Sequence, residues 1–114
     1  MFREGCEAPL RHRHALPDGA TLLLMPAWNA RFSGVKVVQV VPANAARGLP
    51  AVQASYLLSD AATGQPLALL DGGELTDRRT AAASTLAGRF LARPDSSRLL
   101  VLGSGRVAAA LAEA

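Results

Sequence analysis

The sequence has one cysteine and no apolar run long enough to cross a bilayer. Cys6 stands alone among 114 residues, which excludes a disulfide within the chain and fits a reducing compartment. The N-terminus has no apolar core of the kind that a secretory signal needs, so nothing indicates export. We therefore expect a cytoplasmic protein with no membrane segment.

Aromatic side chains are also scarce, with one Trp, one Tyr and three Phe. The net charge of +3 and the isoelectric point near 10.0 would suit nucleic acid. However, the arginines are scattered and never stand more than two in a row. A surface that follows a phosphate backbone needs clustered cations and stacking rings. We expect no nucleic-acid binding.

Metal-ligating and nucleophilic arrangements are missing too. His12 and His14 share one side of an alternating stretch, but no third ligand stands at a usable spacing. No Ser/His/Asp or Cys/His arrangement is persuasive. We expect neither a metal site nor a hydrolytic triad.

Lysine is nearly absent, since eleven of the twelve basic residues are arginine. The exception, Lys36, lies in the apolar run Gly34–Val41. Burying an ammonium costs on the order of several kcal/mol unless a partner compensates, and lysine suits proton transfer or carboxylate binding. Period-2 alternation groups Lys36 with Val38 and Val40, which favours an inward amine. A lysine on an exposed sheet face or edge is the alternative.

The first seventy residues read as short strands joined by turns. Strands are predicted over residues 9–15, 21–25, 32–41, 51–59 and 66–70. Pro26 is expected to stop the second strand, and Gly5 to close the last turn of a preceding helix. This pattern is typical of an antiparallel meander or open half-barrel in an α+β arrangement.

Helical spacing begins at Glu74 and continues to Leu91. Arg79 lies at the centre of an apolar stripe formed by Leu75, Ala82, Leu86 and Phe90. An arginine on a core-facing stripe near a helix start needs an anionic partner. That partner is a substrate carboxylate or cofactor phosphate in one interpretation, and a structural acid such as Asp71 in the other.

The last segment has the order strand, glycine turn, helix. An apolar strand is predicted over residues 98–102, and Gly103-Ser104-Gly105-Arg106-Val107-Ala108 then opens a helix. This is the G-x-G-x-x-(G/A) pattern, in which glycines allow a tight turn and let the backbone approach a pyrophosphate. The spacing predicts the start of a dinucleotide site. The acid expected about 20 residues further on would lie past Ala114.

Taken together, these motifs resemble the ornithine cyclodeaminase/μ-crystallin family. The matching segments follow one another in order along nearly the whole chain, at residues 22–28, 34–38, 48–52, 56–64, 66–72, 74–84 and 101–106. The Gly-Val-Lys and Arg-Thr-Ala-Ala-Ala-Ser segments are the specific ones. One departure is Ala51, where the family often has a threonine whose hydroxyl touches the cofactor.

The resemblance implies an α/β protein that binds NAD or NADP and acts on an amino acid or a cyclic imine carboxylate. It implies a β-rich substrate and dimerisation domain over 1–93, the start of a Rossmann domain over 94–114, and a homodimer. These segments are most similar to the Δ1-pyrroline-2-carboxylate reductase branch, whose members reduce a cyclic ketimine to proline. Ornithine cyclodeaminase and alanine dehydrogenase are alternatives, as is a non-catalytic μ-crystallin-like binding protein.

The resemblance also assigns roles to residues. Lys36 would contact the substrate carboxylate or transfer a proton, and Arg11 would bind the carboxylate. Arg79 would face both cofactor and substrate, with Thr80 beside it. The phosphate-binding turn would comprise Gly103, Ser104, Gly105, Arg106 and Val107. Because family enzymes are roughly three times as long, we expect a piece that lacks the first helix and most of the Rossmann domain, and that is inactive alone.

Overall fold

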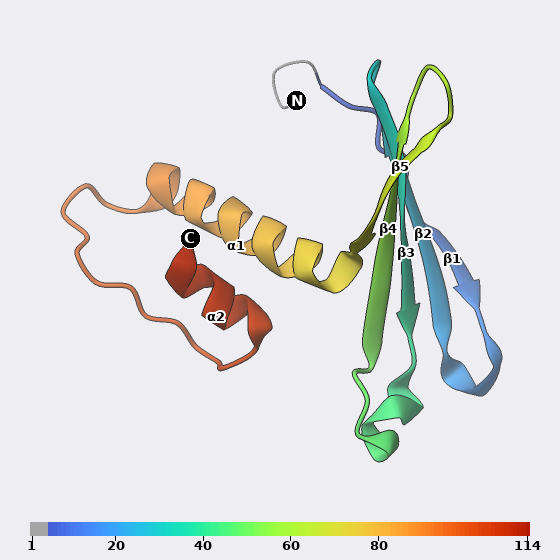
Figure 1. Cartoon of the computed structure of the whole chain (residues 1–114). Coiled ribbons are helices and arrows are strands. Elements are labelled where there is room, and N and C mark those ends of the chain that lie inside the picture. Colours follow the sequence, from blue (N-terminus) through green and yellow to red (C-terminus); the bar gives the residue numbers. More distant parts are fainter. Residues whose placement is uncertain (1–4) are drawn as a thin grey trace. The chain divides into compact units, whose positions relative to one another are not determined.

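The computed structural model describes residues 5–114, and Figure 1 shows their arrangement. The strands and helices are β1 (His12–Ala15), β2 (Thr21–Trp28), β3 (Phe32–Val40), β4 (Val52–Asp60), β5 (Pro66–Asp71), α1 (Gly72–Leu91) and α2 (Arg106–Glu113). Two short 3-10 helices, η1 (Pro17–Gly19) and η2 (Pro42–Arg47), lie in the connections. The chain divides into two compact units, one up to Gly73 and one from Glu74 to Ala114. The predicted boundary at residue 93 stays a prediction.

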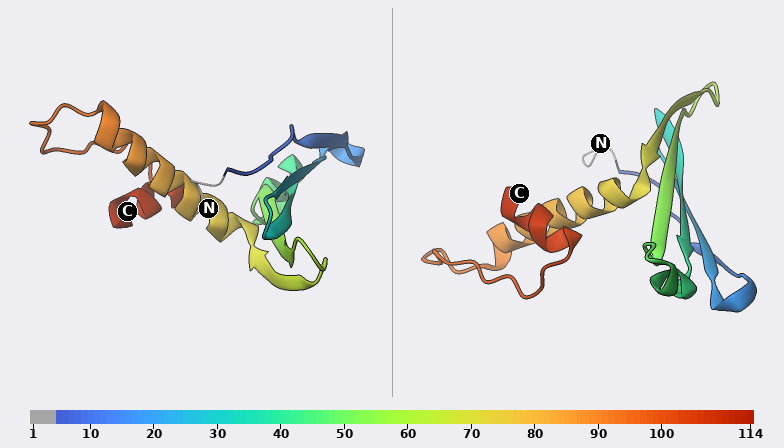
Figure 2. Two further views of the ribbon diagram at one scale, coloured as in Figure 1. Left: turned by 90° about the horizontal axis from the view of Figure 1, so that it is seen from above. Right: turned by 60° about the horizontal axis from the view of Figure 1, so that its bottom comes forward.

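The first unit is one antiparallel sheet with the order β1-β2-β3-β4-β5, as Figures 1 and 2 show. Each strand pairs with its neighbour in sequence, which confirms the predicted meander. Short polar turns set the register. Asn29 accepts hydrogen bonds from the Arg31 and Phe32 amides before β3, and Gly64 takes a φ of 72° before β5.

The Asp60 carboxylate organises the turn between β4 and β5. It accepts hydrogen bonds from the amides of Ala62 and Thr63 and from the Thr63 hydroxyl, at 2.8 to 3.0 Å. The bonds from Thr63 lower the pKa of Asp60, because they favour the charged form of an exposed carboxylate.

The prediction that Pro26 stops the second strand is wrong, because β2 runs on to Trp28. The amide and carbonyl of Trp28 both bond to Glu7, so alternation turns the Pro26 nitrogen to that same side. There the β1 pairing has already ended at His12. The missing N–H of Pro26 would face the β1 side, where β2 has no paired residue at this position. The pairing of Pro26 with Val35 of β3, on the other side, is therefore undisturbed.

The sheet has two distinct faces, because successive side chains point to opposite sides. We call one the lysine face; its members are Arg13, Leu23, Met25, Lys36, Val38, Ala54, Tyr56 and Leu70. We call the other the histidine face; its members are His12, His14, Leu22, Leu24, Trp28, Val35, Val37, Leu57 and Leu69. The prediction that His12 and His14 lie on one side of their strand is thereby confirmed.

The second unit contains α1 from Glu74 onward and α2. The predicted inward stripe on α1 is wrong for the described chain, since Leu86 is 55% exposed and Phe90 80% exposed. The buried residue is instead Ala81, which lines a small hollow together with Ala110 of α2. Position 79 lies about 200° around the helix from position 81, so Arg79 is on the exposed side.

Two further expectations concern the ends of the chain. Residues 98–102 form no strand, and Leu102 is 88% exposed. A strand of a parallel sheet needs neighbouring strands to satisfy its backbone groups, and the described residues of this unit include none. The helix turn predicted before Gly5 falls on residues 1–4, outside the described residues; Gly5 itself has a φ of 72°.

Candidate functional site

Lys36 stands in the middle of the sheet, on the third of five strands. Its direct cross-strand partners are Met25 on β2 and Tyr56 on β4, and Tyr56 in turn pairs with Leu70 on β5. The lysine is half-buried, as is Tyr56, and its same-face neighbour Val38 is 7% exposed. The ammonium therefore rises from a largely apolar row of the lysine face.

Gly34 explains how Tyr56 lies. A Cβ built on Gly34 would come within 2.6 Å of Tyr56 Cζ and 2.9 Å of the Leu57 carbonyl oxygen. The Tyr56 ring therefore lies across β3 in the space that a side chain at position 34 would fill. Because positions 34 and 36 share a face, the phenol end rests one step along β3 from Lys36.

The predicted carboxylate arginine lies at the edge of the same sheet. Arg13 on β1 pairs with Leu23 and so belongs to the lysine face. Arg11 lies two residues earlier, just outside β1. The Glu7–Trp28 bridge is one residue out of step with the His12–Leu24 pair, so regular alternation does not extend through residues 8–11. Both side chains are exposed. The structure therefore places Arg13 on the face of Lys36 and assigns Arg11 to neither face.

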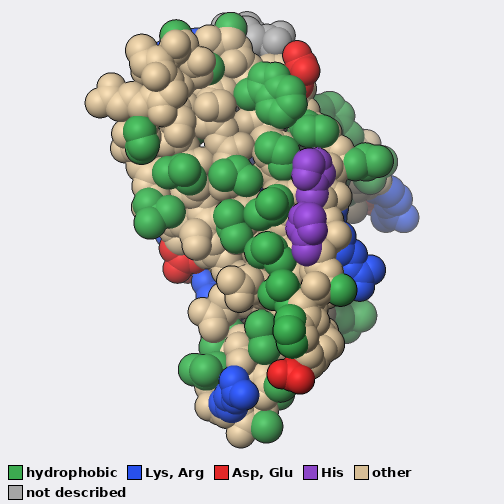
Figure 3. Space-filling model, turned by 90° about the vertical axis from the view of Figure 1, so that its right-hand side faces the viewer, with side chains coloured by type: hydrophobic (Ala, Val, Ile, Leu, Met, Phe, Trp, Pro, Cys, Tyr) green, Lys and Arg blue, Asp and Glu red, His purple; other side chains and the backbone are tan. Residues whose placement is uncertain are grey.

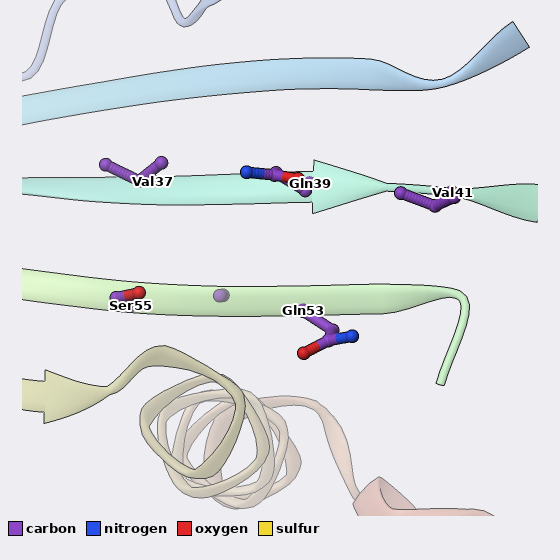
Figure 4. Close-up of a pocket in the computed structure, with 6 residues that line it drawn as sticks. Val37, Gln39, Val41, Gln53 and Ser55 are labelled. Atoms are coloured by element: carbon purple, nitrogen blue, oxygen red, sulfur yellow. The ribbon is translucent and has the colours of Figure 1, made fainter. Parts of the chain in front are cut away.

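A hollow of about 280 Å³ lies between β3 and β4, and Figure 4 shows its lining. Val37, Gln39, Gln53 and Ser55 belong to its walls. These positions alternate with Lys36 and Tyr56, so this hollow opens on the opposite side of the sheet. None of the described residues that line it has an ionisable side chain. The chemistry of Lys36 is not directed into it.

The glycine turn in the second unit fits a pyrophosphate. Gly103 has a φ of 114°, a conformation that favours glycine, and a Cβ on Gly105 would meet nothing within 4 Å. Gly105 caps α2 without a side-chain hydrogen bond, and no acidic residue stands in the first turn of the helix. The N–H groups at this helix start are therefore open to an anion approaching the bare backbone. The residues present fit a dinucleotide phosphate.

The Arg106 side chain forms ion pairs with two acidic residues of α1. Its Nε lies 2.7 Å from Asp77 Oδ2, and its Nη2 lies 3.6 Å from Glu74 Oε2. Glu74 also pairs with Arg78 at 2.6 Å, and this carboxylate raises the pKa of Arg78. The backbone N–H of Arg106 lies at the helix start, where a bound phosphate would accept a hydrogen bond from it.

The remaining predicted residues lie on α1. Arg79 is exposed and Thr80 is half-buried. They belong to the same compact unit as the turn at residues 103–107, whereas Lys36 and Arg11 belong to the other unit. The site roles of all these residues stay predictions.

Sequence reasoning missed two residues with definite structural positions. Tyr56 was not singled out, because its place beside Lys36 follows from the β3–β4 register and not from a local pattern. Asp77 was missed because its partner, Arg106, stands 29 positions later, and no local pattern signals an ion pair at that separation.

Comparison with known proteins gives a consistent result. The model of the ornithine cyclodeaminase/mu-crystallin family matches residues 6–114. An uncharacterized protein of Schizosaccharomyces pombe is 56% identical, with 100% of this chain and 37% of the relative covered. The Δ1-pyrroline-2-carboxylate reductase of Paracoccus denitrificans is 39% identical, with 99% of this chain and 39% of the relative covered.

Solved structures resemble the chain in the same way. Thermococcus litoralis Δ1-pyrroline-2-carboxylate reductase, in complex with NADH and L-proline, is 41% identical with a TM-score of 0.72; the match covers 83% of this chain and 30% of that one. An archaeal alanine dehydrogenase dimer with bound NAD is 34% identical with a TM-score of 0.74; the match covers 84% and 29%. The chain spans between 32% and 39% of the length of the first curated relatives it matches.

Proposed function

Because the chain belongs to the ornithine cyclodeaminase/mu-crystallin family, we propose that the whole protein reduces a cyclic ketimine carboxylate of the Δ1-pyrroline-2-carboxylate type, using NADH or NADPH. The observation that carries the proposal is the row Met25–Lys36–Tyr56, which puts the single lysine on a half-buried sheet face. The reductase from Paracoccus denitrificans and the complex from Thermococcus litoralis support this choice of substrate.

Lys36 and Arg11 hold the substrate carboxylate in this proposal. A carboxylate bound by an ammonium or a guanidinium forms charge-assisted hydrogen bonds, which are about twice as strong as neutral ones. Arg79 and Thr80, which lie on α1 in the other compact unit, keep the cofactor role that the family resemblance implies. The apolar neighbours Met25 and Val38 suit the carbon ring of a small cyclic imine, since they offer no competing polar group.

The turn at residues 103–107 holds the cofactor pyrophosphate through its backbone N–H groups. The conformation of Gly103 and the open space above Gly105 support this assignment. When bound, the nicotinamide supplies the hydride that saturates the imine carbon. The ion pair with Asp77 keeps the Arg106 side chain on α1, so its backbone rather than its charge serves the phosphate.

The protein assembles as a homodimer through the histidine face. The two histidines form a column beside hydrophobic side chains in Figure 3, and Leu69 is 75% and Trp28 40% exposed. An apolar face of this kind needs a cover, and large exposed apolar patches mark interaction sites. A second copy is the occupant that the dimer of the related alanine dehydrogenase supports.

The direct test gives the whole protein NADH or NADPH together with Δ1-pyrroline-2-carboxylate and follows nicotinamide absorbance. We expect oxidation of the cofactor and formation of proline. The resemblance to an alanine dehydrogenase favours reductive amination of pyruvate as the second candidate, and pyruvate with ammonia tests it. Ammonia release from ornithine without net NADH accumulation would identify a cyclodeaminase. Absence of turnover with every substrate would contradict a catalytic role.

A further inference from the structure

The lysine face presents a second polar group besides the lysine. Tyr56 stands directly opposite Lys36 in the β3–β4 pairing, so both side chains rise from the same side of the sheet. Directly opposed Cβ atoms in antiparallel strands lie roughly 5 Å apart. A ligand that reaches the ammonium of Lys36 therefore reaches the neighbourhood of Tyr56.

Gly34 determines where the hydroxyl of Tyr56 lies. The phenol end occupies the space of the missing side chain at position 34. Positions 34 and 36 are same-face neighbours on β3, separated by roughly 7 Å along the strand. The Tyr56 hydroxyl thus lies above Gly34, on the same face of β3 as Lys36.

The hydroxyl is available to a ligand. It makes no hydrogen bond with another residue in the described range 5–114, and the side chain is half-buried. A half-buried phenol usually finds a hydrogen-bond partner. Here the geometry leaves that partner to come from outside the sheet.

We propose that the Tyr56 hydroxyl is a substrate-binding group that donates a hydrogen bond to the same carboxylate that Lys36 holds. The proposal rests on the proposed function, because it presumes an anionic substrate on the lysine face. An ammonium is a point charge that fixes distance but little orientation. A second donor two residues further along β3 fixes the orientation of the carboxylate plane, and it discriminates against substrates that lack the acid.

The test compares Tyr56→Phe with Lys36→Ala in the whole protein. Tyr56→Phe keeps the ring over Gly34 and removes only the hydroxyl. We expect KM for the ketimine carboxylate to rise about tenfold or more, as for a lost hydrogen bond to a charged group, while kcat changes less than twofold. Ser59→Ala removes a hydroxyl from the other side of β4 and should leave both constants unchanged.

A binding measurement without turnover accompanies the kinetics. The melting temperature of wild type should rise with added L-proline, and Tyr56→Phe should need about tenfold more proline for the same rise. If Lys36→Ala is inactive while Tyr56→Phe matches wild type in KM and proline response, the inference about Tyr56 is wrong and the proposed function stands. A fall in kcat at unchanged KM also contradicts it. If Lys36→Ala retains full activity, the role of Lys36 and the inference about Tyr56 both fail, whereas absence of turnover in wild type would contradict the proposed function itself.

Discussion

At the scale of the residue, Gly34 and Gly88 are two glycines with opposite reasons to be there. A side chain at 34 would meet Tyr56 and the Leu57 carbonyl, whereas one at 88 would meet nothing within 4 Å. We expect Gly34→Ala to lower the free energy of unfolding by about 1–3 kcal/mol through overpacking. Gly88→Ala should raise it by about 0.5–1 kcal/mol, because alanine is the better helix former. Urea unfolding of the two variants measures both signs.

The double variant shows where the cost at Gly34 arises. Tyr56→Ala removes the ring that a new methyl group would strike, so Gly34→Ala should cost less in that background than in wild type. Equal costs in the two backgrounds would mean that the Leu57 backbone, and not the tyrosine, excludes the side chain.

Asp60 gives a residue-scale prediction about pH. Its pKa is lowered in the folded protein, so its stabilisation is fully present above the unfolded value of about 3.9 and disappears as pH falls through the folded pKa. Amide hydrogen exchange in the β4–β5 hairpin should accelerate over that acidic range. Asp60→Asn keeps an acceptor oxygen but cannot titrate, so the extra acceleration should vanish. Identical pH profiles for wild type and variant would contradict this.

At the scale of the element, Arg106 of α2 pairs with two acids of α1, Asp77 at 2.7 Å and Glu74 at 3.6 Å. The Asp77 side chain is 16% exposed and that of Arg106 is 66% exposed. We expect Asp77→Asn to weaken protection of the α2 amides by about 1 kcal/mol. Asp95→Asn is the matched control, since it breaks the Arg93–Asp95 pair, whose side chains are 79% and 71% exposed. If both variants change α2 equally, the contribution of Asp77 is not specific.

The elements also show what sequence patterns can and cannot predict. Five strands were predictable because turn residues and alternation act locally, within a few positions. The continuation of β2 through Pro26 was not, because it depends on which neighbour faces the proline nitrogen. Residues 98–102 have a strand-like sequence but no partner strand among the described residues of their unit. The prediction of an inward stripe on α1 was wrong because hydrophobic spacing indicates which side of a helix is apolar but not whether another element covers that side.

At the scale of the whole molecule, the candidate site was only partly visible in the sequence. Lys36 stood out by type and by its apolar surroundings, and the turn at residues 103–107 by its glycines. Its neighbour Tyr56 required the register between β3 and β4, which pairs residues twenty positions apart. Local patterns do not encode such pairings, because register depends on the turns and on which face is buried.

Association through the histidine face can be tested by placing one charge on that face. Leu69 is 75% exposed in the chain, so Leu69→Lys should fold normally yet place an ammonium in the proposed interface. We expect sedimentation of the whole protein to change from dimer to monomer. Leu49→Lys, at a half-exposed position outside both faces, should leave the dimer intact. A Leu69→Lys protein that remains dimeric would place the interface elsewhere.

The central claim is that Lys36 acts on the substrate. The most direct measurement is kcat/KM of the whole protein for Δ1-pyrroline-2-carboxylate with Lys36→Ala, beside Lys36→Arg as the variant that retains a cation. The account predicts a loss of about a hundredfold or more for Lys36→Ala, because a charge-assisted contact to the carboxylate disappears, with partial activity in Lys36→Arg. A kcat/KM within twofold of wild type for Lys36→Ala would contradict the account and remove this lysine from the site.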